Sequence, residues 1–509
     1  MARRVGLSLA FRDMWQSSCC SFPSVSVMRK MAHEVISIGC FDRVETNGGA
    51  FEQVCLMRGE NPNLAVREFA GLLRKAGIKT QMLERGLNAL RLNPVSADLR
   101  ELMFRVKSAQ GVDVARSFCG LNDHRNLRLS IEYAKAAGMV SQVALPIVCS
   151  PVHTAGHYMQ LVSHAVEYGC HEICIKDMSG QGDPLFIAEL IRSIKTVYPS
   201  MFVQYHSHCG ASPRESLLAA VHAGADCVDV ALGPLAGGVS HPEVLDVVSW
   251  LREDGFIVRD VDMEAYRRLL SLINDCLPVR SDDLDSSGVH CARVSVYDTL
   301  YAAGLPGGMI ASLIEELPAY YSAVKGASCE LTFNQFVGSF AEEVGYVWPA
   351  LGYPPMVTPF SQYVAGAALS NLLSLANGQP RWSGLSVGVW NMILGRMGQL
   401  PGELDSELVA LAQSRGLEFF DGDPQLLYPL ALDRYRTLML AEGWSFGSDD
   451  EDLLEFAMHE AQYRDYIASR SSSLSDILDP KSVVADEAVY AAIAMALHDY
   501  LSVHGGQKQ

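Results

Sequence analysis

The chain has 509 residues, of which 49% are hydrophobic and 19% are charged, and its formal net charge at pH 7 is -18. This length leaves room for more than one domain. The negative charge argues against nucleic acid as a partner, because phosphate binding needs clustered lysine and arginine side chains.

Compartment is indicated by the cysteines and by the absence of long apolar segments. The 13 cysteines follow no regular spacing, which is typical of reduced thiols in a cytoplasmic protein. No apolar run reaches the roughly 18 residues that a membrane span needs. The short apolar run over residues 5–11 leads into Arg12 and Asp13 without a small-residue cleavage site, so we interpret it as a first core strand and not as a signal peptide.

Short apolar strands alternate with amphipathic helical patterns, such as residues 64–76 and 185–197, through the first half of the chain. Strands are expected to begin near Val5, Val35, Lys79, Val112, Gln142, Glu172, Phe202 and Asp226. Eight strand–helix units in about 250 residues predict a parallel (β/α)8 TIM barrel. A doubly wound open sheet is the alternative, but no glycine-rich dinucleotide fingerprint follows the first strand.

A mainly helical pattern begins after Trp250, with breaks rich in glycine, proline and aspartate. We therefore expect an α/β catalytic barrel domain over residues 1–260 and a mainly α-helical C-terminal domain over residues 261–504 that completes the active site. Residues 505–509 are expected to form a disordered tail.

Two histidines, His206 and His208, lie two residues apart in a strand-like run. Side chains at this spacing share one face of a strand and can bind one metal ion. Two surface histidines in a turn would give the same sequence pattern. Asp13 and Lys176 also fall near the carboxyl ends of predicted strands, where barrel enzymes carry their chemistry. One carboxylate and two imidazoles suit Zn, Mn, Co or Fe. Lys176 could join them only as a carbamate, and by spacing alone it could equally form an ion pair with Asp177 or Asp13.

Several motifs, in the same order, resemble the carboxyltransferase component of biotin-dependent enzymes: pyruvate carboxylase, the oxaloacetate decarboxylase alpha subunit and transcarboxylase. The resemblance extends from about residue 8 to about residue 375. The motifs are Arg12-Asp13-x-x-Gln16-Ser17, Met82-Leu83-Glu84-Arg85-Gly86, Leu121-Asn122-Asp123-His124, Ser150-Pro151-Val152-His153-Thr154, Ile175-Lys176-Asp177-Met178, His206-x-His208, Pro234 to Pro242, Leu305-Pro306-Gly307-Gly308-Met309 and Leu351 to Pro359.

The resemblance implies a divalent metal, Zn, Mn or Co, which acts beside the keto acid. Its ligands would be Asp13, carbamylated Lys176, His206 and His208. The family pattern makes Lys176 part of the catalytic group through this modification.

The resemblance also assigns substrate contacts. Arg85 matches the arginine that holds the 2-oxo acid, and its planar fork suits that role; an ordinary salt bridge with Glu84 or Glu52 is the alternative. Gln16 matches a glutamine that contacts the substrate, and Glu52 stands in for a substrate-binding aspartate. Thr358 matches the threonine that moves a proton between biotin and the substrate methyl group, although a threonine before Pro359 also suits a turn.

Four substitutions depart from the family pattern: Trp15 replaces a histidine, Leu92 a tyrosine, and Cys119 and Cys209 acidic residues. The segment after Cys209 also differs, and the run Gly48-Gly49-Ala50-Phe51-Glu52 is one residue shorter than its counterpart in the family. Losing polar partners changes what a site accepts. We therefore hypothesise an altered acceptor, and we expect Trp15 and Leu92 to make the pocket more apolar.

The predicted function is metal-dependent transfer of a carboxyl group between carboxybiotin and a 2-oxo acid such as pyruvate or oxaloacetate. The chain has neither a biotinylation motif nor a glycine-rich ATP-binding unit, so biotin would come in trans on a carrier protein, with a separate biotin carboxylase subunit. The resemblance further implies a homodimer, and the cysteine pattern indicates a cytoplasmic location. The alternative is a biotin-independent decarboxylase or C–C lyase of the Arg-Asp/His-x-His barrel superfamily, and a third possibility is a catalytically silent scaffold.

Overall fold

The computed structural model describes residues 3–19, 21–277, 289–326 and 331–478. Its centre is a closed barrel of eight parallel strands in sequence order, in which β8 pairs with β1. The strands are β1 Gly6–Leu9, β2 Arg43–Gly48, β3 Lys79–Glu84, β4 Val114–Phe118, β5 Val140–Pro146, β6 Glu172–Asp177, β7 Phe202–Ser207 and β8 Cys227–Val230. The predicted (β/α)8 TIM barrel is thereby confirmed, and the open-sheet alternative is wrong.

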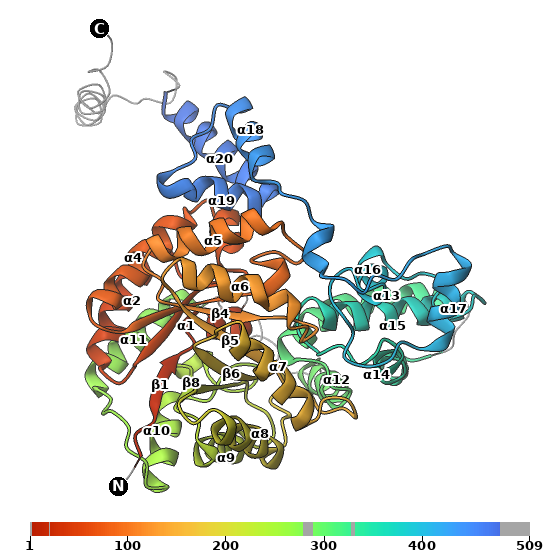
Figure 1. Ribbon diagram of the computed structural model, residues 1–509, viewed down its shortest axis with the longest axis horizontal. Helices are drawn as coiled ribbons and strands as arrows, with labels where there is room; N and C mark the ends of the chain where they lie inside the picture. Colours follow the sequence, from red (N-terminus) through yellow and green to blue (C-terminus); the bar gives the residue numbers. More distant parts are fainter. Residues whose placement is uncertain (1–2, 20, 278–288, 327–330, 479–509) are drawn as a thin grey trace.

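Helices surround the barrel (Figure 1). They are α1 Phe11–Cys19, α2 Val25–Ile38, α3 Phe51–Met57, α4 Pro62–Lys75, α5 Ala97–Ala109, α6 Arg125–Ala136, α7 Ala155–Glu167, α8 Pro184–Val197, α9 Pro213–Ala223, α10 Val244–Glu253 and α11 Met263–Cys276. Helix α8 shows how the sequence sets these elements: Asp183 caps its first turn, Pro184 follows at the first helical position, and Ile187, Leu190, Ile191 and Ile194 form its buried stripe.

The second strand differs from the prediction. Residue Val35, where that strand was expected, lies in α2, and the strand is β2. Met28, Met31, Val35 and Ile38 are all buried at helical spacing, so their apolar run is the stripe of an amphipathic helix. The true strand reads Arg-Val-Glu-Thr-Asn-Gly, and it escaped recognition because its buried polar side chains are paired with polar groups from other parts of the barrel.

The rest of the described chain is helical and forms two further parts (Figure 1). Helices α12 Val289–Ala302, α13 Gly307–Gly326, α14 Phe333–Ala350, α15 Phe360–Ala376, α16 Val387–Ile393 and α17 Ser406–Ser414 project to one side of the barrel. Helices α18 Leu432–Ala441, α19 Glu451–Met458 and α20 Glu460–Leu478 pack together above α5, and α20 also packs against α3. The expected mainly helical second half is confirmed for these residues. The tail predicted over 505–509 lies outside the described residues.

The packing of α11 bears on the boundary predicted at residue 260. Helix α11 begins at Met263 but packs against α2 on the outside of the barrel. The domain boundary after residue 260 stays a prediction.

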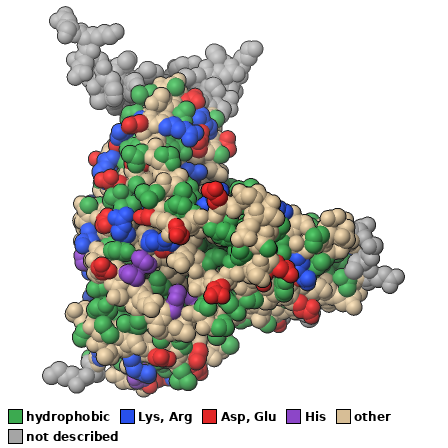
Figure 2. Space-filling view, turned by 45° about the vertical axis from the view of Figure 1, so that its right-hand side comes forward, with side chains coloured by type: hydrophobic (Ala, Val, Ile, Leu, Met, Phe, Trp, Pro, Cys, Tyr) green, Lys and Arg blue, Asp and Glu red, His purple; other side chains and the backbone are tan. Residues whose placement is uncertain are grey.

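Charged side chains are intermixed on the face of the molecule in Figure 2, where acidic and basic groups alternate over the barrel and the helices above it. Among the described helices, none is both long enough and apolar enough to cross a membrane.

Candidate active site

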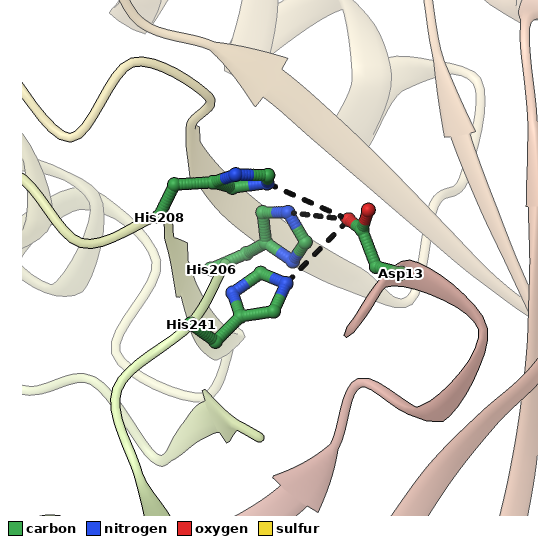
Figure 3. A group of neighbouring side chains, drawn as sticks. All are labelled: Asp13, His206, His208 and His241. Carbon is green, nitrogen blue, oxygen red and sulfur yellow. Dashed lines mark ion pairs between the residues drawn. The ribbon is translucent and has the colours of Figure 1, made fainter. Parts of the chain in front are cut away.

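Four buried side chains converge at the mouth of the barrel, where the strands have their carboxyl ends (Figure 3). Asp13 lies on the first turn of α1, just past the carboxyl end of β1, near which the sequence placed it. Its Oδ2 atom is 3.3 Å from His206 Nε2, 3.7 Å from His208 Nε2 and 3.5 Å from His241 Nε2. The potential ligand atoms of the four residues all lie within 4.8 Å of one another.

The predicted lysine belongs to the same group. Lys176 lies near the end of β6, is 1% exposed, and its Nζ atom is 2.8 Å from His206 Nε2. Burial lowers the pKa of this amine, with Asp13 acting in the opposite direction. The structure therefore brings together Asp13, Lys176, His206 and His208, as the sequence predicted, and leaves their roles as ligands a prediction.

Each of the three imidazoles is oriented through Nδ1. His206 Nδ1 is 2.6 Å from Asp229 Oδ2, His208 Nδ1 is 2.6 Å from the carbonyl of Val239, and His241 Nδ1 is 2.8 Å from the carbonyl of Ser207. When Nδ1–H donates to such an acceptor, the lone pair of the ring lies on Nε2. All three lone pairs then point toward Asp13.

His241 is the residue that sequence reasoning missed. It was noted only as part of the motif that ends at Pro242, and it lies in the segment between β8 and α10. The signal was available, because this segment also follows the carboxyl end of a barrel strand.

The chemistry of this group suits a bound cation. Asp13 Oδ2, His208 Nε2 and His241 Nε2 are buried and form no hydrogen bond to the described residues. Burial alone would raise the pKa of Asp13, but Arg12 and the three imidazoles together hold it well below its ordinary value. Burial lowers the pKa of His206 to about 4. An ionised carboxylate and neutral imidazoles are the forms that bind a divalent metal.

A cavity of about 470 Å³ opens beside the four residues. The barrel side is lined by Asp13, Gln16, Arg85, Lys176 and His208, and the opposite wall comes from α13, α15 and the loop before α15. Thr358 lies in that loop, so the predicted substrate residues Arg85, Gln16 and Thr358 share one cavity with the predicted metal ligands.

Arg85 faces the cavity without a carboxylate partner among the described residues. Its Nη1 group donates to the backbone carbonyls of Gly49 and Leu90, at 3.2 and 3.0 Å. Neither ion pair considered from the sequence, with Glu84 or with Glu52, is formed. Burial lowers the pKa of Arg85 to about 10, and the neighbouring Arg12 adds to this effect. An anionic ligand would relieve this uncompensated charge.

Gln16 is already partly engaged. Its Oε1 atom accepts from Arg12 Nη1 at 2.9 Å and from the amide of Ala50 at 3.4 Å. Its NH2 group is the part left to contact an oxygen of a ligand.

Glu52 does not line the cavity, although the sequence predicted a substrate contact. The residue is fully buried on α3, where its carboxylate accepts from Asn47 and lies 3.4 Å from Lys107 Nζ. The side chain of Glu52 therefore points toward Lys107 of α5 and not into the cavity.

The four departures from the family pattern also lie away from the cavity lining. Trp15 is 1% exposed in the core, and Leu92 is 45% exposed at the surface. The thiol of Cys119 accepts a hydrogen bond from Asn126. Our expectation that Trp15 and Leu92 make the pocket more apolar is therefore wrong. Its apolar wall is formed by Leu83, Phe118, Met178, Met309, Leu313, Met356, Val357 and Leu369.

Fold and site together define a TIM barrel with a candidate metal centre at its mouth and a helical region that closes the cavity. The family model described as "Conserved carboxylase domain" matches residues 300–501. A pyruvate carboxylase subunit of Methanocaldococcus jannaschii is 29% identical over 464 residues, which are 88% of this chain and 75% of that protein. The methylmalonyl-CoA carboxyltransferase 5S subunit of Propionibacterium freudenreichii subsp. shermanii is 26% identical over 462 residues, 90% of this chain and 86% of that protein.

A solved structure has the same fold. The carboxyl transferase domain (Y628A) of Rhizobium etli pyruvate carboxylase, determined with pyruvate, aligns with a TM-score of 0.77 at 22% identity, over 95% of this chain and 79% of that one. The resemblance inferred from the motifs is confirmed: the chain is similar in sequence to carboxyltransferase components of biotin-dependent carboxylases, and it shares the fold of a carboxyl transferase domain.

Proposed function

We propose that this chain is a metal-dependent carboxyltransferase that moves a carboxyl group between carboxybiotin, carried by a partner protein, and a 2-oxo acid. The observation that carries the proposal is the single cavity that holds Asp13, Lys176, His208, Arg85 and Thr358. The related proteins named above support the same reaction class.

Asp13, His206 and His208 would hold the cation, His241 would add a fourth protein group, and Lys176 would contribute as a carbamate. A divalent metal there supplies positive charge that favours the enolate form of the 2-oxo acid. The burial of Lys176 supports carbamate formation, because a neutral amine is the form that reacts with CO2.

Charge balance supports the same assignment. Two arginines and three carboxylates, all buried, are joined by ion pairs around the imidazoles: Arg12, Arg116, Asp13, Glu45 and Asp229. These side chains carry one net negative charge. A carbamate on Lys176 makes two, and a divalent cation then leaves the buried group neutral, which avoids the large cost of an uncompensated buried charge.

The substrate groups follow from the same reasoning. The carboxylate of the 2-oxo acid pairs with Arg85, whose fork can donate two hydrogen bonds, and the NH2 group of Gln16 donates to an oxygen of the acid. The hydroxyl of Thr358 can accept a proton from the substrate methyl group while it donates its own to the biotin nitrogen. Carboxybiotin supplies the carboxyl group, and a separate biotin carboxylase would recharge the carrier. A homodimer and a cytoplasmic location stay predictions.

The first prediction tests this reaction in reverse. The purified chain, loaded with Zn²⁺, Mn²⁺ or Co²⁺, should release pyruvate from oxaloacetate faster when free biotin is added. The variant Thr358→Val should lose roughly 10²–10⁴-fold of this biotin-dependent rate. Thr437→Val, an exposed threonine on α18 whose hydroxyl donates to the carbonyl of Asp433, is the matched control.

Other outcomes separate the alternatives. Turnover of oxaloacetate that is equally fast without biotin, and unaffected in Thr358→Val, would support the lyase in place of the transferase. A well-folded chain that binds no metal and turns over no 2-oxo acid would support the scaffold. A panel of 2-oxo acids, carboxylated in the forward direction with a biotinylated carrier, would identify the acceptor.

A further inference from the structure

A carboxylate without any assigned role lies behind the candidate metal centre. Asp229 on β8 is 2% exposed, and both of its oxygens are used: Oδ1 accepts from Gln204 Nε2 at 2.5 Å, whereas Oδ2 lies 2.6 Å from His206 Nδ1 and 2.7 Å from Arg116 Nη1. The alternation of β8 directs Asp229 into the barrel while Val228 and Val230 point outward.

We infer that Asp229 is a positioning residue that holds His206 in the tautomer and orientation in which Nε2 can bind the cation. This inference rests on the proposed metal centre and adds a role for a residue that does not touch the metal.

The position of Arg116 explains why His206 needs the carboxylate of Asp229. Its Nη1 atom is 3.0 Å from His206 Nδ1 as well as 2.7 Å from Asp229. An arginine is always a donor, so without the carboxylate it would donate to Nδ1 and shift the imidazole proton to Nε2, where it would block metal binding. The carboxylate of Asp229 accepts hydrogen bonds from both Arg116 and His206 Nδ1–H, so the imidazole proton stays on Nδ1.

The contact is part of a closed ring of buried groups. Arg116 also lies 3.4 Å from Glu45, Glu45 pairs with Arg12, Arg12 lies 3.5 Å from Asp13, and Asp13 returns to His206 at 3.3 Å. Two of the predicted ligands, His206 and Asp13, are therefore connected through four charged side chains: Asp229, Arg116, Glu45 and Arg12. Such supporting contacts fix ligand geometry and basicity in metal sites.

His206 differs in this respect from the other imidazoles. His208 and His241 are oriented by the backbone carbonyls of Val239 and Ser207. Among the described residues, Asp229 is the one side-chain carboxylate that accepts from Nδ1 of an imidazole in this group, so its replacement isolates the effect on His206.

The test compares Asp229→Asn with a matched variant, Glu172→Gln. Glu172 is also a buried barrel carboxylate that pairs with an arginine, Arg43, and accepts from a glutamine, Gln142, but it lies outside the ring. Metal affinity is measured on the resting protein by calorimetry, and the visible absorption spectrum of the Co²⁺ form reports the ligand geometry.

We expect Asp229→Asn to weaken Co²⁺ and Zn²⁺ binding roughly 10–100-fold and to change the Co²⁺ spectrum, whereas Glu172→Gln retains the wild-type affinity and spectrum. Equal affinity in Asp229→Asn and wild type would overturn the inference while leaving the metal centre intact. A wild-type chain that binds no cation would overturn the metal centre itself, and with it this role.

A second measurement applies if Asp229→Asn does not fold. The proton that His206 Nδ1 shares with Asp229 should give a proton NMR signal downfield of the amide region in the metal-loaded wild type. The signal should vanish in His206→Gln. Its absence from the wild type would contradict the assigned tautomer.

Discussion

Arg85 brings into the cavity a positive charge that forms no ion pair with a carboxylate of the described chain. Its hydrogen bonds to Gly49 and Leu90 fix the guanidinium without using its charge. The two requirements of an acid-binding arginine, a fixed orientation and an unmatched charge, are thus met at one residue.

A substitution at Arg85 should affect acid binding more than folding. Arg85→Lys keeps the charge but loses the planar fork, so we expect the KM for the 2-oxo acid to rise by about 10–100-fold, the equivalent of one charge-assisted hydrogen bond of about 1.5–3 kcal/mol. Arg91→Lys, a neighbour outside the cavity lining, should leave KM near the wild-type value. Steady-state kinetics with the acid varied at fixed biotin check this, and an unchanged KM in Arg85→Lys would remove Arg85 from the substrate site.

The rule that chemistry lies at the carboxyl ends of barrel strands was enough to bring Asp13, Lys176, His206 and His208 together. It did not find Asp229, because a single aspartate between two valines carries no sign that it faces an arginine and an imidazole across the barrel. The substrate contact of Glu52 was predicted from the family resemblance, and nothing in the sequence indicated that its carboxylate would lie beside Lys107 of α5.

At the scale of elements, a cluster of buried ion pairs joins α19 to α5 and α3 of the barrel. Lys107 Nζ on α5 lies 2.9 Å from Glu455 on α19 and 3.4 Å from Glu52 on α3, and all three side chains are at most 1% exposed. One ammonium cannot fully compensate two buried carboxylates. Burial raises the pKa of Glu455 to about 7, whereas Lys107, working against burial, lowers the pKa of Glu52.

This cluster predicts a pH-dependent stability. The pKa of Glu455 is raised from 4.5 in the folded state, so its proton stabilises the folded chain fully below about pH 4.5, and this contribution is lost as the pH rises through about 7. The unfolding free energy of the wild type relative to Glu455→Gln should therefore fall between pH 5 and pH 8, by at most about 1.4 kcal/mol per pH unit for one proton. Urea titrations followed by fluorescence measure it, since Trp444 packs against Phe456 of α19.

Two further variants sharpen this test. Glu52→Gln should weaken the pH dependence of the unfolding free energy. Without the second carboxylate, the charge of Lys107 acts on Glu455 alone and favours its ionised form. Glu451→Gln, on the same helix but paired with Arg67, should preserve the wild-type slope. If the unfolding free energy of Glu455→Gln falls with pH as steeply as that of the wild type, the proton belongs to another group.

Strand β2 shows which elements the sequence could not predict. Patterns of apolar residues located the other seven strands within a few residues, because their outward faces pack against helices. In β2 the buried side chains of Arg43 and Glu45 pair with Glu172 and Arg12, which lie 129 and 33 residues away in the sequence. A strand defined by partners that lie far away in the sequence has no local signature.

At the scale of the whole molecule, the cavity depends on two parts of the chain, but the candidate metal ligands come from the barrel alone. They lie on α1, β6, at the end of β7 and in the segment after β8. The binding of a cation therefore links the first strand–helix junction to the last, at the place where the barrel closes, without involving α13 or α15. The helical half supplies Thr358 and most of the apolar wall, whereas the barrel supplies Leu83, Phe118 and Met178.

Metal removal should accordingly lower the thermal stability of the barrel. A ligand that binds only the folded state stabilises it by about 2.7 kcal/mol at 100 times its Kd, which corresponds to a Tm increase of roughly 5–10 °C for a unit of barrel size. Zn²⁺ or Co²⁺ should thus raise the Tm of the chelator-treated chain by several degrees.

Asp13→Asn should abolish the shift, because it removes the one carboxylate that all three imidazoles face. Asp254→Asn, which breaks a surface pair with His222, should retain it, since a cation bound nonspecifically to exposed acidic and imidazole groups would respond equally to both substitutions. Differential scanning calorimetry distinguishes the two cases, and an equal shift in Asp13→Asn and the wild type would show that the stabilising cation binds elsewhere.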